Sequence, residues 1–274
     1  MKNININAMY FSPTETTKKT VSFIGKKISE KQGDSASFKT IDFTLPEVRK
    51  EKPEFTKDDF LIIGVPVYAG RVPNVLLDYL NSIEGNGAYA AAVVLYGNRN
   101  FDDALIELRD ILISNGFTII AGGAFIGQHS FSRTLGDNRP DDSDMEMAAE
   151  FAEKIYCKLS QTNLKSIEVK GNKPYRPYYV VLDKTNKPVY DFKKIKPKTN
   201  EEECIDCKIC VEACPMGSID NDNVAVVPGI CIKCCACIKK CPVNAKYFDD
   251  KDFIDHKKDL EKKYKKRREP EIFI

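Results

Sequence analysis

Hydrophobic residues in the first 160 positions of the chain occur in two alternating patterns. Continuous apolar runs occupy residues 60–65 and 89–96, and strand-like segments rich in apolar residues lie at 4–11 and 117–126, with a weaker one at 38–43. Continuous apolar runs of this length are typical of parallel strands that are buried on both faces. The pattern therefore predicts five strands in this part of the chain.

Segments with apolar residues every three or four positions separate and follow these runs. They cover residues 16–30, a stretch that begins near Pro73, residues 102–114, and a last stretch in which Ser143 and Glu146 are expected to form a capping box. The alternation of strands and helices predicts an α/β fold with a parallel sheet covered on both faces. In such folds ligands bind beyond the carboxyl ends of the strands.

Changes in amino-acid composition divide the chain into four parts. Residues 1–161 form the expected α/β domain, and residues 162–200 are rich in proline, lysine and tyrosine. We expect the latter to be an extended strap against both domains rather than a flexible linker. Residues 201–250 hold most of the cysteines, and residues 251–274 form a charged tail. The tail is expected to be a solvated helix or a frayed end, the alternative being a docking patch for an acidic redox partner.

Eight of the ten cysteines form two copies of the pattern C-x2-C-x2-C-x3-C-P. This spacing is that of bacterial [4Fe–4S] clusters, in which the fourth cysteine of each run ligates the other cluster. The predicted ligand sets are Cys204, Cys207, Cys210 and Cys241 for one cluster, and Cys231, Cys234, Cys237 and Cys214 for the other. A zinc site uses pairs of CxxC or mixed Cys/His sets, and a disulfide framework belongs to short secreted chains. Neither alternative explains why both runs have a third cysteine at the same x2 spacing after the second, followed by x3-C-P.

The remaining two cysteines fall outside the ligand pattern. Cys235 lies within the second run and is expected to be a spare residue packed near a cluster. Cys157 lies on the last predicted helix of the α/β domain, and we expect it to be a core thiol.

Composition narrows the functional classes. The chain has 274 residues, 42% hydrophobic residues and a formal net charge of +2. This length accommodates two domains, and the near-balanced charge gives no reason to expect nucleic-acid binding. The sequence shows no signal peptide and no apolar stretch long enough to span a bilayer. We therefore expect a soluble cytoplasmic protein, which agrees with its thiol content.

The turn after the first predicted strand carries four hydroxyl side chains, those of Ser12, Thr14, Thr16 and Thr17. The turn opens a helix, whose N-terminus offers unpaired backbone N–H groups and the positive end of its dipole to a phosphate. The chain has no glycine-rich dinucleotide fingerprint and no Walker lysine, so a monophosphate is favoured. The alternative is an ordinary helix cap, for which one hydroxyl is sufficient.

The turns after the third and fourth predicted strands reach the same edge of the sheet. Tyr68 and Phe101 are expected to flank a flat heteroaromatic ring, and backbone amides near them to bind its polar edge. The alternative is that these turns are surface loops. The candidate binding residues in them are Val67, Tyr68, Ala69, Gly70, Gly97, Asn98, Arg99 and Phe101. His129, Arg71 and Arg99 are weak candidates for a catalytic or substrate-binding role, with packing or solvated positions as the alternative.

Four segments and the cysteine run together resemble flavodoxin-like/ferredoxin fusion proteins of anaerobes. The segments are YFSPTETTKK, GVPVYAGRVP, YGNRNFDDAL and GGAFIGQHSFS, and the resemblance covers nearly the whole chain. It implies a five-stranded flavodoxin-like sheet and a small α+β ferredoxin domain with two [4Fe–4S] clusters. It also implies FMN, with the phosphate at Ser12, Thr14, Thr16 and Thr17 and the isoalloxazine between the two later loops. Glu15 replaces a glycine of many flavodoxins, and we expect its carboxylate to face solvent.

A flavin exchanges electrons singly or in pairs, whereas a [4Fe–4S] cluster passes them one at a time. The combination predicts an oxidoreductase-type electron-transfer flavoprotein with protein redox partners; whether it is also an enzyme is left open. One alternative is a reductase in which the ferredoxin domain supplies FMN with electrons for a small organic substrate. Another is a redox-sensing interaction module.

Overall fold

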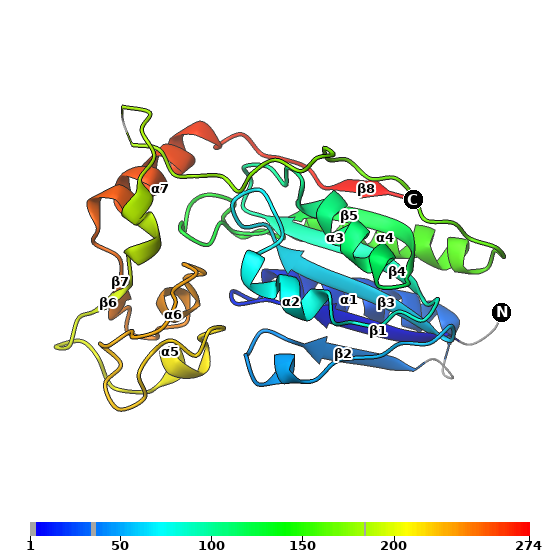
Figure 1. Cartoon of the computed structure of the whole chain (residues 1–274), viewed down its shortest axis with the longest axis horizontal. Helices are drawn as coiled ribbons and strands as arrows, with labels where there is room; N and C mark the ends of the chain where they lie inside the picture. The colour runs from blue at the N-terminus through cyan, green and yellow to red at the C-terminus, as the bar shows by residue number, and fades with distance from the viewer. Residues whose placement is uncertain (1–3, 34–36, 184) are drawn as a thin grey trace.

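The main sheet has six strands in the order β2-β1-β3-β4-β5-β8 (Figure 1). The computed structural model describes residues 4–33, 37–183 and 185–274. The first five strands are parallel, and their order is that of flavodoxins. They are β1 (Asn5–Tyr10), β2 (Phe38–Asp42), β3 (Asp59–Pro66), β4 (Tyr89–Tyr96) and β5 (Thr118–Ile126). The predicted α/β class and flavodoxin-like fold are thus confirmed, with one further strand.

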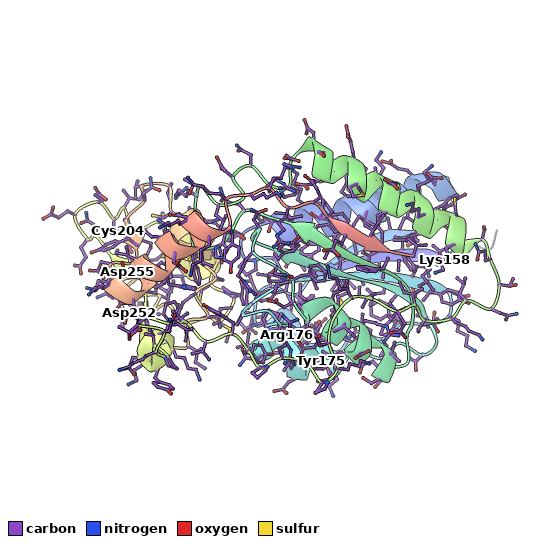
Figure 2. The ribbon with its side chains drawn as sticks, turned by 90° about the horizontal axis from the view of Figure 1, so that it is seen from above. Lys158, Tyr175, Arg176, Cys204, Asp252 and Asp255 are labelled. Carbon is purple, nitrogen blue, oxygen red and sulfur yellow. The ribbon has the colours of Figure 1, made fainter. Side chains whose placement is uncertain are left out.

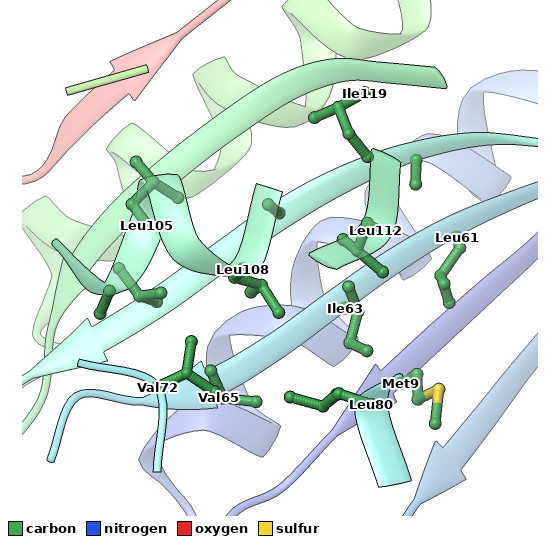
Figure 3. Packing of buried hydrophobic residues seen from close by; sticks show 14 of the residues in the cluster. Met9, Leu61, Ile63, Val65, Val72, Leu80, Leu105, Leu108, Leu112 and Ile119 are labelled. Carbon is green, nitrogen blue, oxygen red and sulfur yellow. The ribbon is translucent and has the colours of Figure 1, made fainter. Parts of the chain in front are cut away.

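Helices cover both faces of the sheet, as continuous apolar strands require. Helices α1 (Thr16–Gln32) and α4 (Asp142–Leu159) pack together on one face. The other face is covered by the short helices η2 (Asn74–Leu76) and α2 (Leu77–Leu80) and by α3 (Ala104–Ser114). Figure 3 shows this second core, in which leucines of α2 and α3 contact the middle strands.

The N-terminus of α4 differs from the expected one. Its N-cap is Asp141, whose carboxylate accepts a hydrogen bond from the backbone of Asp144, and the Asp144 side chain accepts one from the Asp141 backbone. The prediction of a capping box at Ser143 and Glu146 was therefore wrong by two residues. Aspartate caps a helix as well as serine does, so the sequence contains two overlapping signals.

A smaller module lies beyond the carboxyl ends of the parallel strands (Figure 1). It contains the two-stranded sheet of β6 (Lys198–Thr199) and β7 (Lys246–Tyr247) and the short helices α5 (Ile209–Glu212) and α6 (Ala236–Lys239). All eight cysteines of the repeated pattern belong to it. In Figure 2, Cys204 and Lys158 lie at opposite ends of the molecule.

Residues 162–183 and 185–197 run as a mainly extended strap that contains the short helix η3 (Tyr190–Lys194). Along the sheet domain, buried Asp103 accepts hydrogen bonds from the backbone of Asn172 and of Arg176, both of which belong to the strap. The Tyr175 hydroxyl donates to Asp110 on α3, at 2.6 Å (Figure 2 labels Tyr175 and Arg176). Closer to the module, Phe192 of η3 stacks against Phe253 of α7 (Lys251–Lys263).

The C-terminal residues are ordered elements rather than a frayed end. Helix α7 (Lys251–Lys263) is followed by β8 (Glu271–Phe273), which pairs antiparallel with β5 at the edge of the main sheet. The solvated helix or frayed tail was expected at Lys257–Arg268, and α7 covers the first part of this run. The strand β8 follows the charged run and was not predicted, because three residues give too little apolar pattern to be recognised. A short helix, η1 (Val48–Lys50), follows β2.

No helix of the described residues is both long and apolar enough to cross a membrane.

Candidate functional site

A cavity opens at the carboxyl ends of the parallel strands, between the turns that follow β1, β3, β4 and β5. Its walls contain neither a carboxylate nor a basic lysine or arginine side chain among the described residues. The lining residues are Ser12, Pro13, Thr14, Thr16, Thr17, Pro66, Val67, Tyr68, Leu95, Tyr96, Gly97, Gly127, Gln128, His129 and Ser130. We refer to this space as the rim cavity.

The four predicted hydroxyl residues all line the rim cavity at the start of α1. Ser12 is buried and its hydroxyl accepts a hydrogen bond from the Lys18 backbone, which leaves the threonine hydroxyls nearer the opening. Glu15 lies between them with φ of 68°, a conformation that favours glycine. Its carboxylate does not line the cavity but pairs with Lys18 and with Lys240 of the module, and these cations lower its pKa against the effect of burial. The expectation that Glu15 faces solvent thus holds only in part.

The β4–α3 turn differs most from the expectation. Phe101 is only 2% exposed and packs against Tyr96 within the core, so it cannot flank a ring in the rim cavity. Asn98 is also buried, and its amide group donates to the backbone of Tyr264 and of Lys266 in the segment before β8. The turn therefore serves to attach the C-terminal segment, and only Gly97 of its candidate residues lines the cavity.

Ala69, Gly70, Arg71 and Arg99 also lie outside the walls of the rim cavity. The carbonyl of exposed Ala69 accepts a hydrogen bond from the strap, and that of Gly70 accepts one from the start of α3. Arg99 forms an ion pair with Asp102. The side chain of Arg99 and the carbonyls of Ala69 and Gly70 are engaged elsewhere, whereas the expected role of the Ala69 and Gly70 backbone amides in binding a ring stays a prediction.

Arg71 forms a structural ion pair, whereas the sequence suggested a catalytic or substrate-binding role for it. Glu107 on α3 accepts hydrogen bonds from Arg71 Nε at 2.7 Å and Nη2 at 2.6 Å, and from the backbone of Val72 at 2.9 Å. The guanidinium also lies over the rings of Tyr175 and Tyr178, at 4.7 and 4.9 Å from their centres. This pair fixes the β3–α2 turn to α3 and to the strap.

Replacing Glu107 by alanine is expected to lower the free energy of unfolding by roughly 3–5 kcal/mol, because it leaves a largely buried arginine uncompensated. Urea denaturation followed by circular dichroism measures this change. Replacing Glu168, whose exposed carboxylate pairs with Arg109, is the control and should cost less than about 1 kcal/mol. Equal losses of unfolding free energy in the two variants would contradict the claim that the buried Arg71–Glu107 pair stabilises the fold more than the exposed pair does.

His129 lines the rim cavity but lies largely enclosed. Its Nδ1 accepts a hydrogen bond from the backbone of Phe131 at 3.1 Å, and its ring lies where a side chain at Gly97 would have to be. Burial, together with the nearby positive charges of Lys239 and other cations, lowers the pKa of His129 to about 3. The imidazole is therefore neutral at ordinary pH and cannot serve as a ready acid.

The cysteines of the module line two separate cavities. One is lined by Cys204, Cys207, Cys210 and Cys241, which we call the outer set. The other is lined by Cys214, Cys231, Cys234 and Cys237, the inner set, and also by Cys235. In each set the fourth residue comes from the other run of the sequence. Across the described residues, no three His, Cys, Asp or Glu side chains surround the position of a single ion, the arrangement that zinc needs.

The two cysteine loops have matching backbones. Asp206 and Lys208 have φ of 51° and 60°, and Lys233 and Cys235, at the equivalent positions of the second run, have 55° and 59°. The sulfur atoms of the two fourth cysteines accept equivalent hydrogen bonds: Ser218 N donates to Cys214 Sγ at 3.4 Å, and Ala245 N to Cys241 Sγ at 3.2 Å. The repeat in sequence is thus a repeat in structure. Cys157, by contrast, is exposed on α4, so its prediction as a core thiol was wrong.

The inner set is the one that borders the sheet domain. Tyr68, in the wall of the rim cavity, has a pKa well above its usual value because it is buried and because Cys234, Cys235 and Cys231 lie near it. The partly buried side chain of Ile232 packs against the core of the sheet domain. The inner cysteine run therefore contacts the sheet domain through Ile232, the residue after Cys231.

Polar contacts hold the module against the rim. Lys239 Nζ on α6 donates to Gln128 Oε1 at 2.7 Å and to the His129 carbonyl at 2.8 Å. Arg49 after β2 donates to the carbonyl of Pro215 at 2.6 Å. Sequence reasoning missed Lys239 and Gln128, because a lysine next to a ligand cysteine and a lone glutamine carry no signal of a contact between domains.

Comparison with known proteins agrees with this division. Residues 197–220 match the family of 4Fe-4S binding domains. No curated protein matches the chain. Three similar solved structures are a flavodoxin from the domain Archaea, a Fusobacterium nucleatum flavodoxin bound to flavin mononucleotide, and the apo form of an NADH:FMN oxidoreductase. Their identities are 18%, 19% and 17%, and their TM-scores are 0.40, 0.38 and 0.43.

The matched region is a little over half of this chain but nearly the whole of each similar structure. They cover 57%, 58% and 60% of this chain, and 98%, 99% and 95% of their own lengths, in the same order. The family match falls in the module and the strand order identifies the larger domain. The chain therefore joins a flavodoxin-like domain to an iron–sulfur module of the 4Fe-4S type, as predicted.

Proposed function

We propose that this chain is an electron-transfer iron–sulfur flavoprotein that relays electrons between FMN in the rim cavity and two [4Fe–4S] clusters in the module. The observation that carries the proposal is the contact between the two parts: Lys239, two residues after Cys237 of the inner set, donates hydrogen bonds to Gln128 and to the His129 carbonyl, both in the wall of the rim cavity. Such a contact serves the passage of electrons between one-electron protein partners and a two-electron centre.

The residues of the rim cavity suit a flavin monophosphate. The hydroxyls of Thr14 and Thr16 at the start of α1 would hold the phosphate together with the helix N–H groups. The apolar and aromatic wall that includes Val67, Tyr68 and Tyr96 would hold the ring. When bound, FMN supplies the capacity to exchange electrons singly or in pairs, and the protein excludes water and fixes its position.

The two cysteine sets support two clusters rather than one. Each set offers four thiols around its own cavity, and the family match covers only the first run. The backbone hydrogen bonds to Cys214 Sγ and Cys241 Sγ are of the kind that tune cluster potentials. In this arrangement the inner set faces the flavin and the outer set faces away from it, toward redox partner proteins.

The reductase alternative has less support. A catalytic proton donor or acceptor is expected beside the reacting ring, and the rim cavity is lined by no Asp, Glu, Lys or Arg among the described residues. His129 is neutral and already accepts a hydrogen bond. We therefore favour a carrier over an enzyme with an organic substrate.

Reductive titration of the anaerobically purified protein tests the proposal. We expect about four electrons to be taken up per chain, two by FMN and one by each cluster. The measurement follows the visible absorbance during stepwise addition of dithionite, after analysis of iron, sulfide and flavin. A sample saturated with FMN and iron that takes up only two electrons would contradict the relay.

A further inference from the structure

Three lysines of the module lie in or beside the cysteine runs and are buried or partly buried: Lys246 lines the outer cysteine cavity, Lys233 precedes Cys234, and Lys239 lies two residues after Cys237. Lys233 and Lys246 are only 7% and 3% exposed, and Lys239 is partly buried on α6. Within residues 4–33, 37–183 and 185–274, none of the three forms an ion pair with a carboxylate, although neighbouring lysines such as Lys208 and Lys240 do. Lysines are almost never buried unless they are paired, so this arrangement calls for an explanation.

Lys233 and Lys246 donate to neutral carbonyl oxygens, and the ammonium of Lys233 also lies over the ring of Phe192, at 5.5 Å from its centre. Lys233 Nζ donates to the carbonyls of Lys193 at 3.1 Å and Cys231 at 3.4 Å. Lys246, which lines the outer cysteine cavity, donates to the carbonyl of Val224. One lysine thus lies at the first cysteine of the inner set, and the other lies in the wall around the outer set.

Lys239 occupies the position between both cysteine sets and the rim cavity. It follows Cys237 of the inner set by two residues and precedes Cys241 of the outer set by two. Its ammonium group contacts the amide oxygen of Gln128 and the carbonyl of His129, both of which belong to residues of the rim wall.

Burying three cations without negative partners costs free energy unless anions occupy the space between them. Four thiolates outweigh the positive charge of a four-iron, four-sulfide core, so each loaded cysteine set carries net negative charge. We propose that Lys233, Lys239 and Lys246 are the counter-charges of two bound clusters and raise their reduction potentials. This inference rests on the proposed function and adds to it the residues that set the potentials.

The expected effect follows from charge alone. Reduction of a cluster adds one electron, supplied in the test by dithionite, and neither forms nor breaks a covalent bond. A positive charge held close to the cluster favours the reduced form, and its removal favours the oxidised form. Net charge is one of the factors by which a protein sets the potential of such a cluster.

The experiment measures the midpoint potential of each cluster in the full-length holoprotein by electron paramagnetic resonance during a redox titration. With Lys246→Met the outer cluster, and with Lys233→Met the inner one, should show a reduced-to-oxidised ratio about tenfold lower at fixed potential, which is 59 mV for one electron. Lys240→Met is the matched control. This lysine is adjacent to Cys241 but already pairs with Glu15 and, among the described residues, lies outside the walls of both cysteine cavities, so its loss should change the ratio less than twofold.

Arginine variants and iron analysis distinguish an effect of the lysine charge from an effect of its packing. If a methionine variant loses its cluster, the matching Lys→Arg variant should retain the cluster with an unchanged potential. Loss of the cluster in both variants would mean that the lysine acts through packing, which overturns the proposal. Fully loaded methionine variants with wild-type potentials would also overturn it. Wild-type protein that binds no iron would instead refute the proposed function itself, which the initial iron analysis detects separately.

Discussion

Replacing Cys207 and Cys241 together by alanine is expected to leave about four irons per chain, whereas replacing Cys234 and Cys241 together should leave almost none. The wild-type chain should hold about eight. The reason is that Cys207 and Cys241 line the same cavity, so the first variant loses one cluster and keeps the other. Iron and acid-labile sulfide analysis after anaerobic purification measures the effect.

An arrangement in which each run binds its own cluster predicts the reverse result for the two double variants. It would leave almost no iron after the change at Cys207 and Cys241. Two single variants serve as controls: Cys157→Ala and Cys235→Ala should both retain about eight irons. Cys157 is exposed on α4 far from the pattern, and Cys235 lines the inner cavity without belonging to the spacing of the ligands.

Replacing Thr14 and Thr16 together by valine is expected to weaken FMN binding by roughly 100- to 10,000-fold. Hydrogen bonds to a charged group contribute about 1.5–3 kcal/mol each, and every 1.4 kcal/mol is a factor of ten in affinity. Valine preserves the shape of threonine and removes only the hydroxyl. Quenching of flavin fluorescence during titration of the apoprotein measures the dissociation constant.

Riboflavin, which lacks the phosphate, separates this effect from general damage to the cavity. The double variant should bind riboflavin as well as the wild-type protein does. Thr20→Val on the same helix is the matched control, because the Thr20 hydroxyl bonds to the backbone of Thr16 and does not line the cavity. Equal losses of FMN and riboflavin affinity would place the phosphate elsewhere.

Local patterns in the sequence were sufficient for most of the fold. Buried parallel strands such as β3 and β4 appear as continuous apolar runs because both of their faces are covered. The spacing of the cysteines predicts two sets of four, and each set lines its own cavity. The turn at Ser12 was recognisable as well, because its four hydroxyls lie within six residues and start a helix.

The errors concern residues whose partners are distant in the chain. Phe101 follows a strand at the correct edge, but it turns into the core beside Tyr96. Arg71 is matched by Glu107 across 36 positions, and no local pattern announces that pair. Asn98 is held by residues more than 160 positions later. Proximity to a strand end predicts where a backbone goes, but not where a side chain points.

The return of the chain to the main sheet has a consequence for how the two parts stay together. Because β8 pairs with β5 after the module has been traversed, the module is an insertion fastened at both of its ends. A protease that cut only the strap would not set it free, since α7 and β8 would still anchor it. During synthesis, moreover, the edge of the large sheet cannot be completed until every ligand cysteine has been added to the chain.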